Sequence, residues 1–147
     1  MERNRSHCAY MRLFVSTFPK PLLILAAIYF AAGLAHFSHN AEYIAFYPGM
    51  PAWLTRETVY LAWLGVTSLG FISLVLARLD FPALALLLLG IYGAFGLDGL
   101  AHYTLGLCSE HTLMSNFTIW SEAVSGLALL LASAVRVARS TLGLHNG

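Results

Sequence analysis

Two histidines, an asparagine and a carboxylate end an otherwise apolar stretch of this sequence. Residues 35–43 read AHFSHNAEY, and they overlap the end of a run, 22–37, in which His36 is the only strongly polar side chain. Residues three and four apart share a face of an α-helix, so His36, His39 and Asn40 are expected to lie together. Imidazole rings on one helical face can bind a metal ion, exchange protons or ligate haem iron.

Two other apolar segments also carry ionisable residues. Asp98 and His102 are four residues apart near the end of segment 81–103, so an α-helix would place them on one face. Glu122 lies about six residues, or roughly 9 Å at 1.5 Å per residue, inside segment 117–137. An ionisable group at the centre of a membrane span costs about 2.5 to 3.5 kcal/mol. We therefore expect Asp98 and Glu122 to face the protein interior and to meet a partner or a ligand.

The helices that must position these residues have the composition of membrane spans. The chain has 147 residues, of which 59% are hydrophobic and 10% charged, whereas soluble domains carry about 25% charged residues. Four apolar segments approach the ~20 residues that cross a ~30 Å hydrocarbon core, and they cover about residues 21–39, 57–77, 81–103 and 117–137. Continuous apolar runs of this length fit helices. We predict an all-α, integral membrane four-helix bundle that forms a single domain over residues 1–147.

The basic residues predict the orientation of this bundle. Lys and Arg in short loops stay on the cytoplasmic side of a membrane. With a cytoplasmic N-terminus only Arg56 lies outside, and the basic residues inside are Arg3, Arg5, Arg12, Lys20, Arg78, Arg136 and Arg139. Both termini are then cytoplasmic, with a basic leader at residues 1–20 and a tail at 138–147. The polar residues described above gather at the opposite face, which in a bacterial inner membrane is the periplasmic face.

Local signals predict how the helices begin, turn and pack. Thr55, with an acidic residue soon after it, is typical of a helix N-cap. The short connection 78–82 predicts an antiparallel hairpin between the second and third helices. Glycines spaced by three along the third helix permit close approach to a neighbouring helix; they are Gly90, Gly93, Gly96 and Gly99.

One stretch of the chain resembles a known family. Residues 32–37 read AGLAHF, and they are followed by Pro48, by MPAWL at 50–54 and by VYL at 59–61. Over about residues 30–70 the sequence resembles the DoxX-like family of small four-helix membrane proteins, which commonly show an AGxxHF end to helix 1 and a proline-rich outer loop. The resemblance implies the four-helix fold and an association with quinone-linked redox proteins, but it implies no particular reaction.

The first functional hypothesis is a metal or haem centre for redox chemistry or for a reaction on a lipid-soluble substrate. Imidazole and carboxylate groups are ligands for zinc, iron and manganese. A transition metal would be bound by His36, His39, Asp98, His102 and Glu122, whereas haem would be bound by His36 and His102. In this hypothesis Asp98 and Glu122 are the catalytic carboxylates, as ligands or as bases beside the ligands.

Two alternatives stand beside it. The protein is either a metal-free binder or acid/base enzyme for a quinone, an isoprenoid or a sterol-like molecule, with Asp98 and Glu122 as proton donor and acceptor. Or it is a non-catalytic accessory subunit that docks a membrane or periplasmic protein partner. In all three hypotheses the lipid bilayer is the environment, and we expect no nucleic acid partner.

Overall fold

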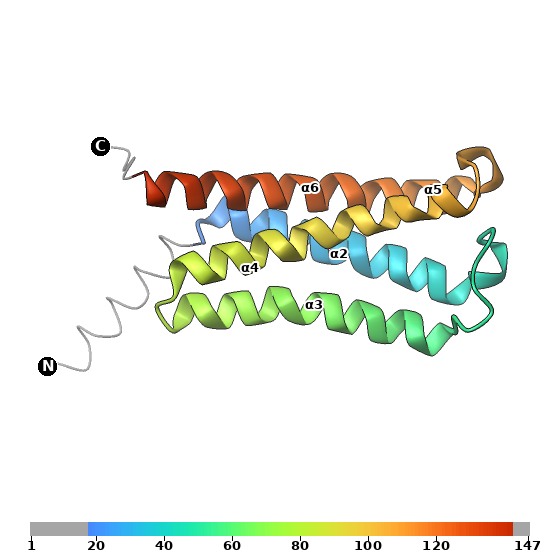
Figure 1. Cartoon of the computed structure of the whole chain (residues 1–147), viewed down its shortest axis with the longest axis horizontal. Coiled ribbons are helices and arrows are strands. Elements are labelled where there is room, and N and C mark those ends of the chain that lie inside the picture. Colours follow the sequence, from blue (N-terminus) through green and yellow to red (C-terminus); the bar gives the residue numbers. More distant parts are fainter. Residues whose placement is uncertain (1–17, 143–147) are drawn as a thin grey trace, which may run out of the picture.

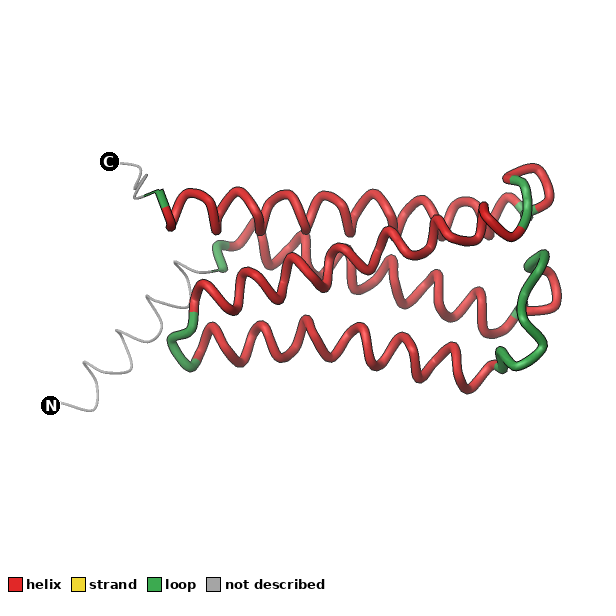
Figure 2. The backbone as a smooth tube through the Cα atoms, in the orientation of Figure 1, coloured by secondary structure: helices red, strands yellow, loops and turns green. Residues whose placement is uncertain are grey.

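The structure is a computed structural model that describes residues 18–142, and nearly all of these residues are helical (Figures 1 and 2). Four spans lie side by side. The first is α2 (Lys20–Glu42) and the second is α3 (Arg56–Arg78). The third is composite, and the fourth is α6 (Leu113–Thr141). Each span is long and apolar enough to cross a membrane. The predicted all-α bundle, with four helices long and apolar enough to span a membrane, is therefore confirmed for the described residues.

The third span is not the single α-helix that we predicted over 81–103. It consists of α4 (Pro82–Ala94), the 3₁₀-helix η2 (Phe95–Ala101) and the short α5 (His102–Leu105). A 3₁₀-helix has three residues per turn, so side chains three apart lie on one face. Two further 3₁₀ turns, η1 (Ile44–Phe46) and η3 (Cys108–Glu110), lie in the loops at the same end of the bundle.

The spans pack as a closed ring of neighbours, in the order α2, α3, α4, α6 and back to α2. The loop between α3 and α4 lies at one end of the bundle, and the two longer loops, 43–55 and 106–112, lie at the other (Figure 1). We call this second end the histidine end, because it contains His36, His102 and His111. The apolar core fills the opposite half, where Leu22, Ala85, Leu86 and Leu89 are buried.

Two predicted local features are confirmed. The Thr55 side chain caps α3 by accepting a hydrogen bond from the Thr58 backbone nitrogen at 3.3 Å, and Thr58 Oγ1 accepts one from the Thr55 nitrogen at 2.9 Å. The α3–α4 hairpin turns through Asp80, whose φ of 66° lies in the left-handed region that Asp tolerates better than most residues. Ser73 Oγ ties its two helices together by donating to the Ala85 carbonyl oxygen at 2.8 Å.

The fourth helix differs from its predicted range at both ends. It begins at Leu113 rather than near residue 117, because the Thr112 side chain caps it by accepting from the Ser115 nitrogen at 3.1 Å. It runs to Thr141, so the start of the predicted tail 138–147 is helical. Most of the predicted basic leader lies outside the described residues.

The predicted close approach at the glycines of the third span is confirmed. A Cβ atom at Gly93 would lie 2.7 Å from the Gly126 carbonyl oxygen, and one at Gly96 would lie 2.9 Å from the Glu122 carbonyl oxygen. Such distances leave room for glycine alone. The ring of Tyr29 fills the remaining space beside Gly96 and Gly126. The third span and α6 therefore touch through their backbones just below the histidine end, which brings the residues around Glu122 close to η2.

Candidate functional site

A cavity of about 230 Å³ lies at the histidine end, between α2, α3 and the third span. Four of the five residues predicted as metal ligands line it, namely His36, Asp98, His102 and Glu122. Asn40 lines it as well, and the remaining wall is mainly apolar. Polar residues from separate helices therefore meet at one cavity.

His36 and Glu122 form a buried pair on the wall of this cavity. His36 Nδ1 is hydrogen-bonded to Glu122 Oε2, and the two residues are only 3% and 2% exposed. The other ring nitrogen, His36 Nε2, is buried and has no hydrogen-bond partner among the described residues. Buried polar atoms are normally hydrogen-bonded, so an unpartnered one needs a specific explanation.

Two glycines make room for the pair. A Cβ atom at Gly99 would lie 3.0 Å from His36 Cε1 and 3.4 Å from Glu122 Oε2. One at Gly33 would lie 3.2 Å from Glu122 Oε1. Because η2 has three residues per turn, Gly96, Gly99 and His102 fall on one face of the third span. The glycine spacing therefore serves the site as well as the packing.

A second polar pair lies next to the first. The Asn40 side chain faces His102 with its amide nitrogen, which donates a hydrogen bond to His102 Nε2 at 3.2 Å. Neutral His102 then carries its hydrogen on Nδ1, which has no partner among the described residues, and neither does Asn40 Oδ1. The rings of His36 and His102 lie edge to face with centroids 5.3 Å apart. The two pairs therefore leave several polar atoms unused at one cavity.

Asp98 does not take the position that we predicted for it. In a 3₁₀-helix each residue rotates the chain by about 120°, so side chains four residues apart point about 120° away from each other. Asp98 and His102 therefore do not share a face, as they would in an α-helix. Asp98 is exposed and lies on the rim of the cavity, whereas Gly99 is buried against His36. In the described part of the chain no hydrogen bond or ion pair involves Asp98. The predicted shared face is therefore wrong, although Asp98 remains beside the cavity.

His39 also lies apart from the cavity. Its Nδ1 is 2.8 Å from the hydroxyl oxygen of Tyr47, and its ring packs on that of Tyr43. Tyr47 comes from the loop 43–55 and is only 4% exposed. Burial raises the pKa of Tyr47, although hydrogen bonds from Ser115 and Thr118 oppose the change. Tyr47 is thus protonated at neutral pH and can donate to His39.

The sequence alone did not mark Tyr47 or His111 as buried members of this site. The Tyr47 ring lies 5.0 Å from that of His102 and 6.0 Å from that of His111, between ring centroids. His111 is 6% exposed, its Nδ1 donates to the Leu107 carbonyl oxygen at 3.0 Å, and its Nε2 has no partner in residues 18–142. Both residues occur in loop segments, where no periodicity reveals which side chains turn inward.

The two loops of the histidine end close over these rings. A Cβ atom at Gly106 would lie 2.5 Å from Pro48 Cγ, and one at Gly49 would lie 2.8 Å from the Leu105 carbonyl oxygen. Gly49 also has a φ of 70°, which glycine adopts easily. The glycines therefore let loop 43–55 press directly on the end of the third span, which keeps Tyr47 buried.

The arrangement bears directly on the metal hypothesis. Within residues 18–142 no three or more His, Cys, Asp or Glu side chains are close enough to hold a metal ion. Three of the predicted ligands are already engaged within the protein, because Glu122 pairs with His36 and Asn40 with His102. His36 and His102 each still keep one ring nitrogen without a partner among the described residues.

No protein family matches the chain, and neither the curated proteins nor the solved structures contain a match. The resemblance to the DoxX-like family therefore remains a prediction.

Proposed function

We propose that this protein binds a lipid-soluble molecule whose polar head enters the cavity at the histidine end and hydrogen-bonds to His36. The observation that supports this proposal is the buried His36–Glu122 pair, which lines a cavity and leaves His36 Nε2 without a partner. Desolvated polar side chains in a mostly apolar cavity are typical of small-molecule sites. Quinones, isoprenoid alcohols and sterol-like molecules are classes of ligand that combine such a polar head with an apolar body.

The chemistry of the pair favours a head with carbonyl or hydroxyl oxygens. An isolated charge is costly in a low-dielectric interior, so the pair is most stable when its net charge is zero. The net charge is zero in two forms: His36 as imidazolium with Glu122 as carboxylate, and His36 as imidazole with Glu122 as carboxylic acid. In both forms His36 Nε2 carries a hydrogen and can donate it to an oxygen atom of the ligand. His102 Nδ1 is a second unused donor and Asn40 Oδ1 an unused acceptor.

The pair can also exchange a proton with such a ligand. Glu122 holds the imidazole orientation through Nδ1, as a carboxylate does for a histidine that acts as an acid or base. Transfer of the Nε2 proton to a ligand oxygen leaves one proton shared between Nδ1 and Glu122, so the pair takes a charge of −1 while the ligand gains the proton and a charge of +1. Asp98, which is exposed on the rim, would meet the ligand where it enters.

The experiment measures thermal unfolding of the full chain in detergent with three probes: decylbenzoquinone, farnesol and cholesterol. A ligand that binds only the folded state raises Tm, and at one hundred times Kd it adds about 2.7 kcal/mol of stability. We expect at least one probe to raise Tm in the wild type and not in His36→Gln or Glu122→Gln. The exposed variant Glu42→Gln is the control and should keep the response. If no probe raises Tm, or if His36→Gln responds as the wild type does, the proposal is wrong.

A metal or haem centre is the second candidate, and one observation favours it. His36, His102 and His111 each keep a buried ring nitrogen without a partner, and each ring is within 6.2 Å of a neighbouring imidazole between centroids. A histidine that ligates metal usually bonds a carboxylate through its other nitrogen, as His36 does. Elemental analysis of the purified protein separates this candidate from the first.

We also propose that the histidine end faces the periplasm of a bacterial inner membrane. The support is the distribution of basic residues, since Arg78, Arg136 and Arg139 lie at the ends of helices opposite the histidine end, and among residues 18–142 only Arg56 lies at it. At the histidine end Arg56 is neutralised, because it binds the Glu42 carboxylate through Nε at 2.8 Å. A ligand would then reach the cavity from the outer leaflet.

A further inference from the structure

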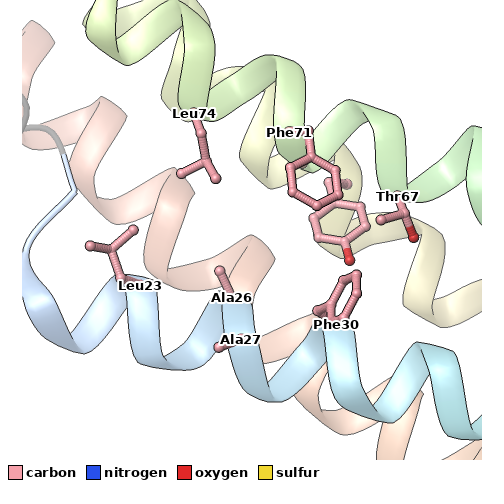
Figure 3. A pocket seen from close by; sticks show the side chains of 9 residues that line it. Leu23, Ala26, Ala27, Phe30, Thr67, Phe71 and Leu74 are labelled. Carbon is pink, nitrogen blue, oxygen red and sulfur yellow. The ribbon is translucent and has the colours of Figure 1, made fainter.

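A second hollow, of about 270 Å³, lies between α2 and α3 on the membrane-facing side of the bundle (Figure 3). Its two walls are helical. Leu23 and Leu74 face each other at one end of it, and Phe30 and Phe71 face each other at the other end (Figure 3). We call this hollow the seam groove. At 1.5 Å per residue, the stretch from Leu23 to Phe30 makes it about 10 Å long.

Small residues create the seam groove. Ala26 and Ala27 line it from α2, and Gly70 lines it from α3, so the two helices cannot fill the space between them. A Cβ atom at Gly70 would lie 2.9 Å from Tyr92 Cε1, so the Tyr92 ring of α4 forms the floor. Ala27 is exposed and Phe71 is 58% exposed. The groove is therefore open at the surface that the bilayer covers.

The seam groove and the polar cavity lie along the same pair of helices. On α2, the last residue that lines the groove is Phe30, and the first that lines the cavity is His36. On α3, the cavity is lined as far as Ala62, and the groove is lined from Thr67 onward. Trp63 lies between the two hollows. Its ring centroid is 5.6 Å from that of Phe30, and its Nε1 is 3.9 Å from the Cβ position of Gly33.

We propose that the seam groove holds the hydrocarbon tail of the molecule whose polar head binds in the cavity. This inference rests on the proposed function. A head at His36 and a tail that passes Trp63 would place one amphiphilic ligand along α2 and α3, with the tail end free to continue into the bilayer. The ligand is therefore a long-chain amphiphile, such as a prenylated quinone or a long-chain alcohol, rather than a compact sterol.

Shape and anchoring, and not the hydrophobic effect, must select this tail. Bilayer chains are as apolar as the groove, so a free lipid chain gains little by entering it. A tail whose head is held at His36 is tethered beside the groove and has a high local concentration there. Occupancy of the groove should therefore depend on the head and on His36.

The experiment uses two photoreactive probes that differ only in the head, hexadecanol and hexadecane, each with a diazirine in the middle of the chain. The full-length protein is labelled in detergent, and the labelled peptides are identified by mass spectrometry. We expect hexadecanol to label 23–30 and 67–74 about fivefold more than the exposed surface around Val124 and Leu127, which corresponds to about 1 kcal/mol. Hexadecane should show no such preference.

Three variants test the assignment. Ala27→Trp fills the groove and should remove the preference, whereas Val124→Trp, a change at an exposed position on α6, should retain it. His36→Gln should reduce groove labelling by hexadecanol to the level seen with hexadecane.

Uniform labelling of all exposed apolar surfaces would overturn the tail assignment, while a Tm response that depends on His36 would still support the head site. Equal groove labelling by both probes in the wild type and in His36→Gln would show that an ordinary bilayer chain occupies the groove, which also overturns the inference. If no probe raises Tm and groove labelling does not depend on His36, the proposed function itself is contradicted.

Discussion

His36 of α2 and Glu122 of α6 are 86 residues apart in the chain, yet they hydrogen-bond to each other in the interior of the bundle. Gly33 of α2 itself and Gly99 of η2 both face the pair, and a Cβ atom at either position would crowd it. The pair is therefore both a structural link between α2 and α6 and the polar centre of the cavity. Several measurements can separate these two roles.

Glu122→Ala should destabilise the protein by about 3 to 5 kcal/mol, because it leaves a buried His36 without its partner. Glu122→Gln should cost much less, since its amide oxygen can still accept a hydrogen bond from His36 Nδ1. Denaturant unfolding in detergent measures both effects. Glu42→Gln, at an exposed pair with Arg56, should change stability little. Equal losses for Glu122→Ala and Glu122→Gln would show that the charge, and not the hydrogen bond, matters.

Gly99→Ala should destabilise the fold and disturb the site. Replacing a helical glycine by alanine usually stabilises a helix by about 1 kcal/mol, but here the new methyl group would lie 3.0 Å from the His36 ring. Overpacking of this kind costs about 1 to 3 kcal/mol. Gly65→Ala is the matched control, because nothing lies within 4 Å of its Cβ position, and it should be neutral or stabilising. The same unfolding assay compares the two, and a stabilising Gly99→Ala would contradict the packing around His36.

Tyr47 should make stability depend on alkaline pH. Its pKa is raised by burial in the folded state, so the unfolded state loses the phenol proton first, above about pH 10. Stability from this residue is then complete below that pH and is lost as the pH rises through the folded-state pKa. Tyr47→Phe should cost about 1 kcal/mol near pH 8, because the hydrogen bond to His39 is lost.

The measurement is the stability difference between wild type and Tyr47→Phe at about pH 8 and about pH 11, and we expect the difference to shrink at the higher value. Other tyrosines titrate equally in both proteins, so they cancel. A difference that stays constant or grows with pH would mean that Tyr47 is not buried as a phenol.

Elemental analysis and an absorption spectrum of detergent-purified protein test the metal hypothesis, with wild type beside His102→Ala. Under the proposed function we expect no stoichiometric metal, no Soret band and an unchanged Tm after treatment with a chelator. About one metal ion or haem per chain, lost in His102→Ala, would instead identify a metal centre. Retention of the metal by the variant would point to ligands outside this site.

Cys108 can report the orientation of the bundle. It is exposed in the loop that precedes α6 at the histidine end, whereas Cys8 belongs to the predicted cytoplasmic leader. A membrane-impermeant maleimide applied to intact spheroplasts should label the wild type and Cys8→Ser, but not Cys108→Ser. Labelling of Cys108→Ser before permeabilisation, with none of Cys8→Ser, would reverse the proposed orientation.

The four spans could be predicted from the sequence because hydropathy is a property of consecutive residues. Apolar runs of membrane length determined the spans, and Thr55 and the connection 78–82 determined a cap and a hairpin. The glycines spaced by three indicated a close helix contact. The depth of Glu122 also followed from its distance to the end of its run, because a helix rises by a fixed amount per residue.

The tertiary structure decided which of these residues meet. The face of the third span depends on whether it is α-helical or 3₁₀-helical, and η2 turned Asp98 to the rim while Gly99 came to face His36. The pairing of His36 with Glu122 depends on how the backbones of the third span and α6 pack at Gly93 and Gly96. Tyr47 and His111 are buried because two loops close on each other, and loops carry no periodic signal that fixes the direction of a side chain.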